Sequence, residues 1–140
     1  MIKRILIDSC VWIAAFYKKD KNHNLGKAFL EWLNEQNNLE IIITDFIIAE
    51  TLNYLRKKAR DQRIVKEIIE TYFDDEKTEI FFTQEEQFHG ALDVFQKYKK
   101  LSFVDSTIVI SYFNLKPDYL LSYDSGFNVF KNIIRYEYPQ

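Results

Sequence analysis

The chain has 140 residues, of which 47% are hydrophobic and 29% are charged, and its formal net charge is -2. A chain of this length is typical of one domain, so we treat residues 1–140 as a single domain. The composition, with few glycines and prolines, excludes a disordered chain. The small negative charge excludes a general electrostatic attraction to nucleic acid, which requires a basic surface.

The single cysteine, Cys10, excludes an intramolecular disulfide and a cysteine-rich zinc site, and it favours a reducing setting. No apolar stretch approaches the roughly 20 residues that a membrane-spanning helix requires. The basic and apolar start of the chain imitates a signal peptide, but Asp8 interrupts it and no clear cleavage site follows. We therefore expect a soluble, cytoplasmic protein without a membrane partner.

Apolar runs of strand length alternate with helical patterns along the whole chain. The strand-like runs are residues 5–7, 41–43, 79–83 and 119–122, followed by a more alternating run at 133–138. Amphipathic helical patterns lie at residues 25–33, 47–55, 64–73 and 88–98, and a further helix is expected at 103–113. Short strands that are apolar on both faces are typical of a parallel sheet covered by helices. We predict a three-layer α/β/α domain with a central, mostly parallel sheet of about five strands.

Four acidic residues lie directly after these strands or in the helices that follow them. They are Asp8, Glu50, Asp105 and Asp124, which are named the acidic cluster below. Right-handed crossovers bring the carboxyl ends of parallel strands to one edge of a sheet, where open α/β sheets place their sites. Hard oxygen ligands of this kind suit Mg²⁺ or Mn²⁺, whereas zinc prefers His or Cys. The pattern therefore predicts a divalent-metal site that acts on a phosphodiester.

Each of these acids also has an ordinary structural explanation. Asp8 and Asp124 can cap the helical segments that follow them, and Ser102 with Asp105 matches a capping box at the start of a helix. Glu50 can be a solvent-facing glutamate, although the apolar residues around it leave little of its helical turn polar. The capping roles and the metal-binding role are compatible, because a cap at the sheet edge also points towards the shared cleft.

Other phosphate chemistries lack their required residues. The three glycines are scattered, so neither a Walker loop nor a dinucleotide fingerprint is present. A haloacid-dehalogenase-like phosphatase needs a second aspartate two residues after Asp8, where this chain has Cys10. His23 and His89 are far apart in the sequence and lie in polar helical settings, which argues against a metal-free ribonuclease that uses two histidines.

The densest positive segment lies between Arg56 and Lys66 and holds six basic residues. An acidic site needs cations from elsewhere to hold substrate phosphates, and Arg56, Arg60 and Arg63 are our candidates for contacts with the phosphates of a nucleic-acid strand. The alternative is a solvated helix face, which is the usual explanation of such a run.

At these residues the sequence resembles the PIN-domain ribonucleases, and in its size the VapC-type toxins of type II toxin–antitoxin pairs. The segments that carry the resemblance are Ile-Leu-Ile-Asp8-Ser9, Ile-Ala-Glu50-Thr-Leu, Leu-Ser-Phe-Val-Asp105-Ser and Leu-Leu-Ser122-Tyr-Asp124-Ser-Gly-Phe. The resemblance covers nearly the whole chain. It implies that the acidic cluster is catalytic and binds the metal ion, with the hydroxyls of Ser9 and Ser122 supporting the site. Ser122 stands where the family frequently has threonine, and it keeps the hydroxyl.

The resemblance also implies a homodimer and, for a toxin, a small antitoxin protein that obstructs the cleft. We accordingly predict an endoribonuclease that depends on Mg²⁺ or Mn²⁺ and hydrolyses phosphodiester bonds of RNA, as the toxin of such a pair. Asp8, Asp105 and Asp124 are expected as inner ligands of one or two ions, with Glu50 as a ligand or a positioner of the attacking water. Two alternatives remain open: a catalytically silent PIN-like module that binds RNA or protein, and a PIN nuclease directed at DNA.

Overall fold

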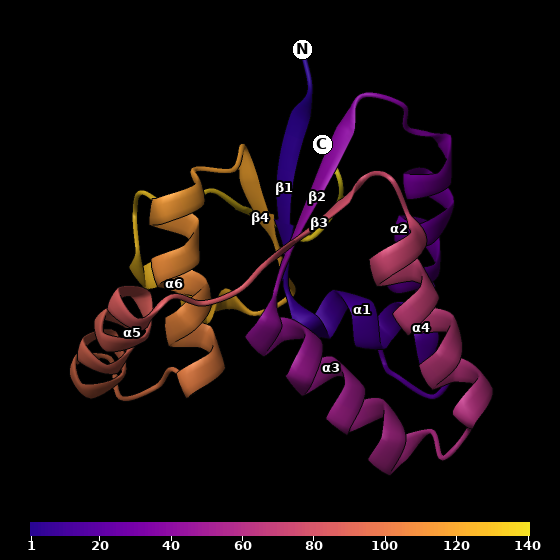
Figure 1. Cartoon of the computed structure of the whole chain (residues 1–140), viewed down its shortest axis with the longest axis horizontal. Helices are drawn as coiled ribbons and strands as arrows, with labels where there is room; N and C mark the ends of the chain where they lie inside the picture. The colour runs from indigo at the N-terminus through magenta and orange to yellow at the C-terminus, as the bar shows by residue number, and fades with distance from the viewer.

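The centre of the molecule is a parallel sheet of five strands, and the computed structural model describes residues 1–140 (Figure 1). The strands are β1 (Lys3–Ile7), β2 (Leu39–Thr44), β3 (Thr78–Phe81), β4 (Tyr119–Leu121) and β5 (Arg135–Tyr136). Their order across the sheet is β3-β2-β1-β4-β5, and every neighbouring pair is parallel. The predicted parallel sheet is confirmed, although the run at residues 133–138 supplies only the two residues of β5.

Helices cover the sheet on both sides. They are α1 (Ser9–Phe16), α2 (His23–Glu35), α3 (Asp45–Lys58), α4 (Gln62–Asp74), α5 (Glu85–Lys97), α6 (Phe103–Leu115) and a 3₁₀ helix, η1 (Ser125–Val129). Figure 1 shows α5 and α6 on one side of the sheet and α1, α2 and α4 on the other. Helix α3 runs below the carboxyl ends of the strands and contacts both α1 and α6. The three-layer α/β/α architecture is thus confirmed.

The inner strands are buried on both faces, which explains their continuous apolar runs. Residues Ile5 to Ile7 of β1 and Ile41 to Ile43 of β2 have no exposed surface, and β4 is buried throughout. A strand that is covered on both sides has no polar face, so its sequence does not alternate. One apolar cluster of 26 buried residues joins the sheet to both helical layers. No helix of the fold combines the length and the apolar character that a bilayer crossing demands.

Helices α1 and α2 cross at very short distance, and Gly26 permits it. A Cβ atom at Gly26 would lie 2.3 Å from the backbone nitrogen of Ala15. Beside this crossing, the buried ring of Trp12 makes edge-to-face contacts with Phe29 of α2 and Tyr72 of α4, at 5.4 and 5.1 Å between ring centroids. Such aromatic pairs stabilise packing beyond their buried area. They hold α1, and therefore its amino-terminal end at the sheet edge, in a defined position.

Candidate active site

Asp8 lies at the centre of the site, at the junction of β1 and α1. Its backbone amide donates to Leu121 O of the neighbouring strand β4 (3.0 Å), and its side chain is only 4% exposed. Oδ1 accepts a hydrogen bond from the Ser9 amide (2.7 Å), so Asp8 caps α1 as its alternative explanation predicted. The second carboxylate oxygen stays turned towards β4.

Ser122, which follows β4 directly, links Asp8 to Asp124. Its fully buried hydroxyl donates to Asp8 Oδ2 (2.7 Å) and accepts from the Asp124 amide (3.1 Å). Asp124 in turn caps η1, because its Oδ1 accepts from the Gly126 amide (2.8 Å). The hydroxyl that the sequence places here therefore fixes both the Asp8 carboxylate and the backbone of Asp124.

Ser9 makes the corresponding link to α3. Its hydroxyl donates to Glu50 Oε1 at 2.5 Å, across 41 residues of chain. Thr44 caps α3 by accepting from the Ile47 amide (3.2 Å), and this sets the helical phase that turns Glu50 towards α1. Glu50 is half-buried and hydrogen-bonded. The interpretation of Glu50 as an ordinary solvent-facing residue does not describe it.

Asp105 begins α6 in the predicted capping box. Its Oδ2 accepts from the Ser102 amide (3.1 Å), and its own amide donates to Ser102 Oγ (3.0 Å). Burial raises the pKa of the Asp105 carboxyl above its ordinary value, the hydrogen bonds from Ser102 lower it, and the charge of Asp124 raises it further. Asp105 therefore both caps α6 and belongs to the acidic cluster.

Within the acidic cluster, the pKa of the Asp8 carboxyl group is raised by burial and by the charges of its neighbours. Burial raises its pKa to about 6, the hydrogen bond from Ser122 opposes this, and the charges of Asp105 and Glu50 raise the pKa further. None of the salt bridges in the molecule includes a member of the acidic cluster. Hydrogen bonds and mutual repulsion therefore connect the four acids, and none of them forms a salt bridge with a lysine or arginine.

The donor set of the acidic cluster fits a hard divalent cation. Carboxylate and hydroxyl oxygens at a site with uncompensated negative charge are the ligands that Mg²⁺ and Mn²⁺ prefer. As the side chains lie, no three of them converge around one point. Glu50, Asp105 and Asp124 each turn an oxygen to a donor of the chain, at Ser9, Ser102 and Gly126. A bound cation would compete with these donors.

None of the predicted basic residues forms a salt bridge with the acidic cluster or lines the groove that contains Glu50. Arg63 pairs with Asp61 (3.2 Å), which caps α4, and both line a hollow that is also walled by residues of α1 and α2. Arg60 adopts a left-handed backbone (φ 54°) in the short link between α3 and α4, and Arg56 is exposed in the last turn of α3. Their predicted contacts with RNA remain a proposal.

A basic residue that the sequence analysis did not select, Lys57, lines a surface groove that also contains Glu50. Asn53, Tyr54 and Lys57 line this groove, at positions three, four and seven residues after Glu50 on α3. These spacings place residues on one face of a helix. The sequence analysis missed Lys57 as a candidate for binding the substrate. Its spacing of seven residues from Glu50, which places both on one face of a helix, could have identified it.

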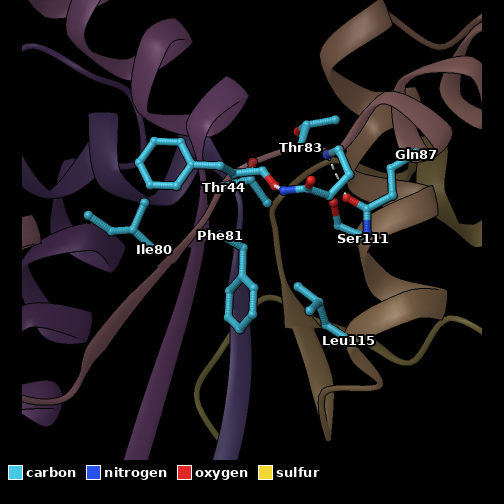
Figure 2. A pocket seen from close by; sticks show the side chains of 9 residues that line it. Thr44, Ile80, Phe81, Thr83, Gln87, Ser111 and Leu115 are labelled. Atoms are coloured by element: carbon cyan, nitrogen blue, oxygen red, sulfur yellow. Dashed lines mark hydrogen bonds between the residues drawn. The ribbon is translucent and has the colours of Figure 1, made fainter.

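A second hollow lies between the end of β3 and α6, and Figure 2 shows its walls. Its volume is about 230 Å³, with Phe81 on the sheet side and Ser111 and Leu115 on α6. The Asp45 carboxylate fastens the crossing segment beside it, since Asp45 accepts from the amide (3.0 Å) and hydroxyl (2.6 Å) of Thr83. No charged residue lines this hollow, so it is poorly suited to a phosphodiester.

Cys10 and the two histidines do not form a nucleophilic site. Cys10 Sγ lies 3.5 Å from Asp8 Oδ2, and burial together with the Asp8 charge raises the pKa of the thiol well above its usual range. The group is therefore a neutral thiol at physiological pH. His23 on α2 contacts Ala14 O through Nδ1 (2.7 Å), whereas His89 lies on α5, on the other side of the sheet.

The stability of the metal-free protein is expected to fall as pH rises from about 4 to above 6. The folded-state pKa of Asp8 is raised from 3.8 to about 6, so the native protein binds this proton more tightly than the unfolded chain does. The stabilisation is complete below the unfolded pKa and is lost as pH rises through the folded pKa. The shift is about two units, worth up to about 3 kcal/mol at roughly 1.4 kcal/mol per unit.

Urea unfolding in EDTA at several pH values measures this effect. The neutral Asp8→Asn side chain should remove the decrease, because a buried amide does not ionise and therefore carries neither the desolvation cost of the charged carboxylate nor its repulsion by Asp105 and Glu50. The matched control is Asp93→Asn on the exposed face of α5, which should follow the wild-type profile. Parallel pH profiles of the wild-type and Asp8→Asn proteins would contradict the prediction.

The fold and the site together define an α/β protein with an acidic site at the carboxyl edge of a parallel sheet, where buried Ser9 and Ser122 contact Asp8 and where Asp8 experiences the charges of Asp105 and Glu50. The sequence model of the PIN-domain family matches residues 5–132 of this chain. The chain belongs to the PIN-domain family. No curated protein sequence matches it at a significant level.

Solved structures of low sequence identity share the whole fold. The structure of VapC20 from Mycobacterium tuberculosis, described as a sarcin–ricin loop cleaving toxin, is 14% identical with a TM-score of 0.78, over 93% of this chain and 96% of that chain. VapBC2 from Rickettsia felis, bound to a DNA fragment of its promoter, is 14% identical with a TM-score of 0.67, over 95% and 97%. FitAcB from Neisseria gonorrhoeae is 11% identical with a TM-score of 0.61, over 94% and 96%. These likenesses independently support the PIN-like fold.

Proposed function

We propose that the protein is a divalent-metal-dependent endoribonuclease and the toxin of a toxin–antitoxin pair. The observation that carries this proposal is the acidic cluster at one sheet edge, in which the Ser9 hydroxyl contacts the carboxylates of Asp8 and Glu50, and the Ser122 hydroxyl links the Asp8 carboxylate to the backbone of Asp124. Membership of the PIN-domain family supports a nuclease. The likeness to toxin structures, one of which is described as cleaving the sarcin–ricin loop, supports RNA as the substrate.

In this proposal, Asp8, Asp105 and Asp124 hold Mg²⁺ or Mn²⁺, and Glu50 orients the attacking water. A bound ion of this kind supplies a water of lowered pKa and stabilises charge on the departing 3′ oxygen. Ser122 and the Ser9 amide keep the Asp8 carboxylate in one orientation. Glu50 is fixed through Oε1, so its other oxygen can accept a hydrogen bond from water. No nucleophile from the protein is required.

We further propose a homodimer and an antitoxin partner. One stripe of α5 remains exposed although it is apolar, with Phe88, Leu92 and Phe95 between 38% and 44% exposed. Residues at these spacings form one face of a helix, and an exposed apolar face favours association. A further similar structure, from Klebsiella pneumoniae (16% identical, TM-score 0.64), is described as a toxin–antitoxin complex, which supports a partner that binds this chain as well.

Cleavage of an end-labelled single-stranded RNA with Mn²⁺, Mg²⁺ or EDTA tests the proposed function. We expect products with either metal ion, none in EDTA, and recovery when Mn²⁺ is added back in excess. A single-stranded DNA of the same sequence should remain intact. Cleavage of the DNA alone would favour the DNA-directed alternative, and tight RNA binding without cleavage would favour the binding module; either result would overturn the proposed activity.

A further inference from the structure

We propose that the groove beside Glu50 binds one nucleotide next to the scissile phosphate of a single-stranded RNA, an inference that rests on the proposed function. In this subsite, Tyr54 contacts the base, Asn53 hydrogen-bonds to the base edge, and Lys57 binds a neighbouring phosphate. The groove lies outside the acidic cluster except for Glu50, which belongs to both.

The groove follows one face of α3 away from the acidic cluster. Its volume is about 430 Å³, and its floor consists of α3 residues spaced at three or four positions, namely Phe46, Ala49, Glu50, Asn53, Tyr54 and Lys57. Val104, next to Asp105 at the start of α6, forms the facing wall. Seven residues separate Glu50 from Lys57, which is about 10 Å along a helix. An RNA strand with a phosphate at the carboxylates can therefore continue along α3 to Lys57.

The aromatic rings of the groove are held in place by other rings. Tyr54 makes an edge-to-face contact with Tyr17 at the end of α1, at 6.2 Å between centroids. Phe46 packs against Phe103 (5.6 Å) and Phe88 (6.3 Å) from the other helical layer. Rings fixed in this way lose little conformational entropy when a base packs against them, and aromatic platforms of this type bind single strands.

The polar groups of the groove suit a nucleotide better than an apolar peptide. The side chain of Asn53 is exposed and makes no hydrogen bond within the chain, so its carboxamide can both donate to and accept from a base edge. Lys57 is exposed and forms none of the salt bridges of the molecule. At one end of the groove the carboxylates would bind a phosphate through the metal ion. At the other end Lys57 would bind the next phosphate directly, so both ends suit the negative backbone of an RNA strand.

Steady-state cleavage of short single-stranded RNAs, randomised on either side of the cleavage site, tests the subsite. Lys57→Ala should raise KM by about tenfold with kcat almost unchanged, and should lower the steepness of the salt dependence by about one phosphate contact. Tyr54→Ala should also raise KM by about tenfold, and Tyr54→Phe should restore it, since the ring provides the stacking. Asn53→Ala should weaken the preference for one base at one flanking position by about tenfold.

The matched control is Lys58→Ala, which removes the neighbouring exposed lysine of the same helix outside the groove. Its KM, salt dependence and base preference should equal those of the wild type. If the wild type cleaves RNA while the groove variants keep its KM and base preference, the subsite is wrong and the proposed function stands. If the wild type cleaves no RNA, the proposed function fails and the subsite fails with it.

Light scattering of the same variants separates a nucleotide from a second copy of the chain. Under the proposal, Tyr54→Ala and Lys57→Ala keep the wild-type oligomeric state, and circular dichroism shows that they are folded. Dissociation of an oligomer with unchanged kinetics per site would mean that another chain covers the groove, which would overturn the proposal.

Discussion

The Asp8→Asn variant is expected to lose metal-dependent RNA cleavage by at least about a hundredfold in kcat/KM, because even partners that only orient metal ligands contribute on the order of 10- to 100-fold. Asp8 is the member of the acidic cluster with the most connections, since it contacts Ser9 and Ser122 and experiences the charges of Asp105 and Glu50. The measurement is cleavage of the labelled RNA in Mn²⁺ under conditions where both proteins are folded.

The same variant has a second expected result that does not depend on activity. Mn²⁺ should raise the melting temperature of the wild type, because a ligand that binds the native state stabilises it. Asp8→Asn should show little or no such rise, while in EDTA at neutral pH it should melt above the wild type because a buried charge is gone. An exposed-site control, Asp93→Asn, should respond to Mn²⁺ as the wild type does. Full activity and an undiminished Mn²⁺ response of a folded Asp8→Asn protein would remove Asp8 from the site.

The Gly26→Ala substitution is expected to destabilise the fold by about 3 kcal/mol, at the upper end of the usual range for overpacking. The added Cβ would lie 2.3 Å from Ala15 N and 2.4 Å from Ala14 C, and both are backbone atoms that cannot rotate away. Relief requires α1 and α2 to separate, which disturbs the packing around Trp12. Urea unfolding at pH 7 provides the difference in the free energy of unfolding.

The matched control for this prediction is Gly90→Ala on α5. There the new Cβ would meet only the side chain of Ile110, at 3.3 Å from Cδ1, and a small rotation relieves the contact. Alanine also favours a helix over glycine by about 1 kcal/mol, so this variant should be close to neutral or slightly stabilised. Equal destabilisation of the two variants would show that the close crossing at Gly26 is not the cause.

The positions of three of the cluster aspartates could be predicted because local rules govern them. Asp8 and Asp124 follow apolar strands and cap the helices behind them, and the spacing of Ser102 and Asp105 is that of a capping box; each of these caps is present. The apolar runs at 5–7 and 41–43 predicted buried parallel strands because a strand covered on both sides has no polar face. Caps between residues close in the sequence and continuous apolar runs can be recognised from the sequence alone.

The contacts that make a site out of these residues were decided by the tertiary structure. The hydroxyl of Ser9 meets Glu50 only because α1 and α3 leave neighbouring strands at the same edge, and Ser122 meets Asp8 only because β4 pairs with β1. Lys57 and Arg56 are equally basic in the sequence. Only the structure shows that Lys57, and not Arg56, lies on the face of α3 that forms the groove with Glu50. The sequence by itself determined which acids cap helices and which strands are buried on both faces. The packing of the helices determined which side chains share a cleft, because such contacts join positions more than 40 residues apart.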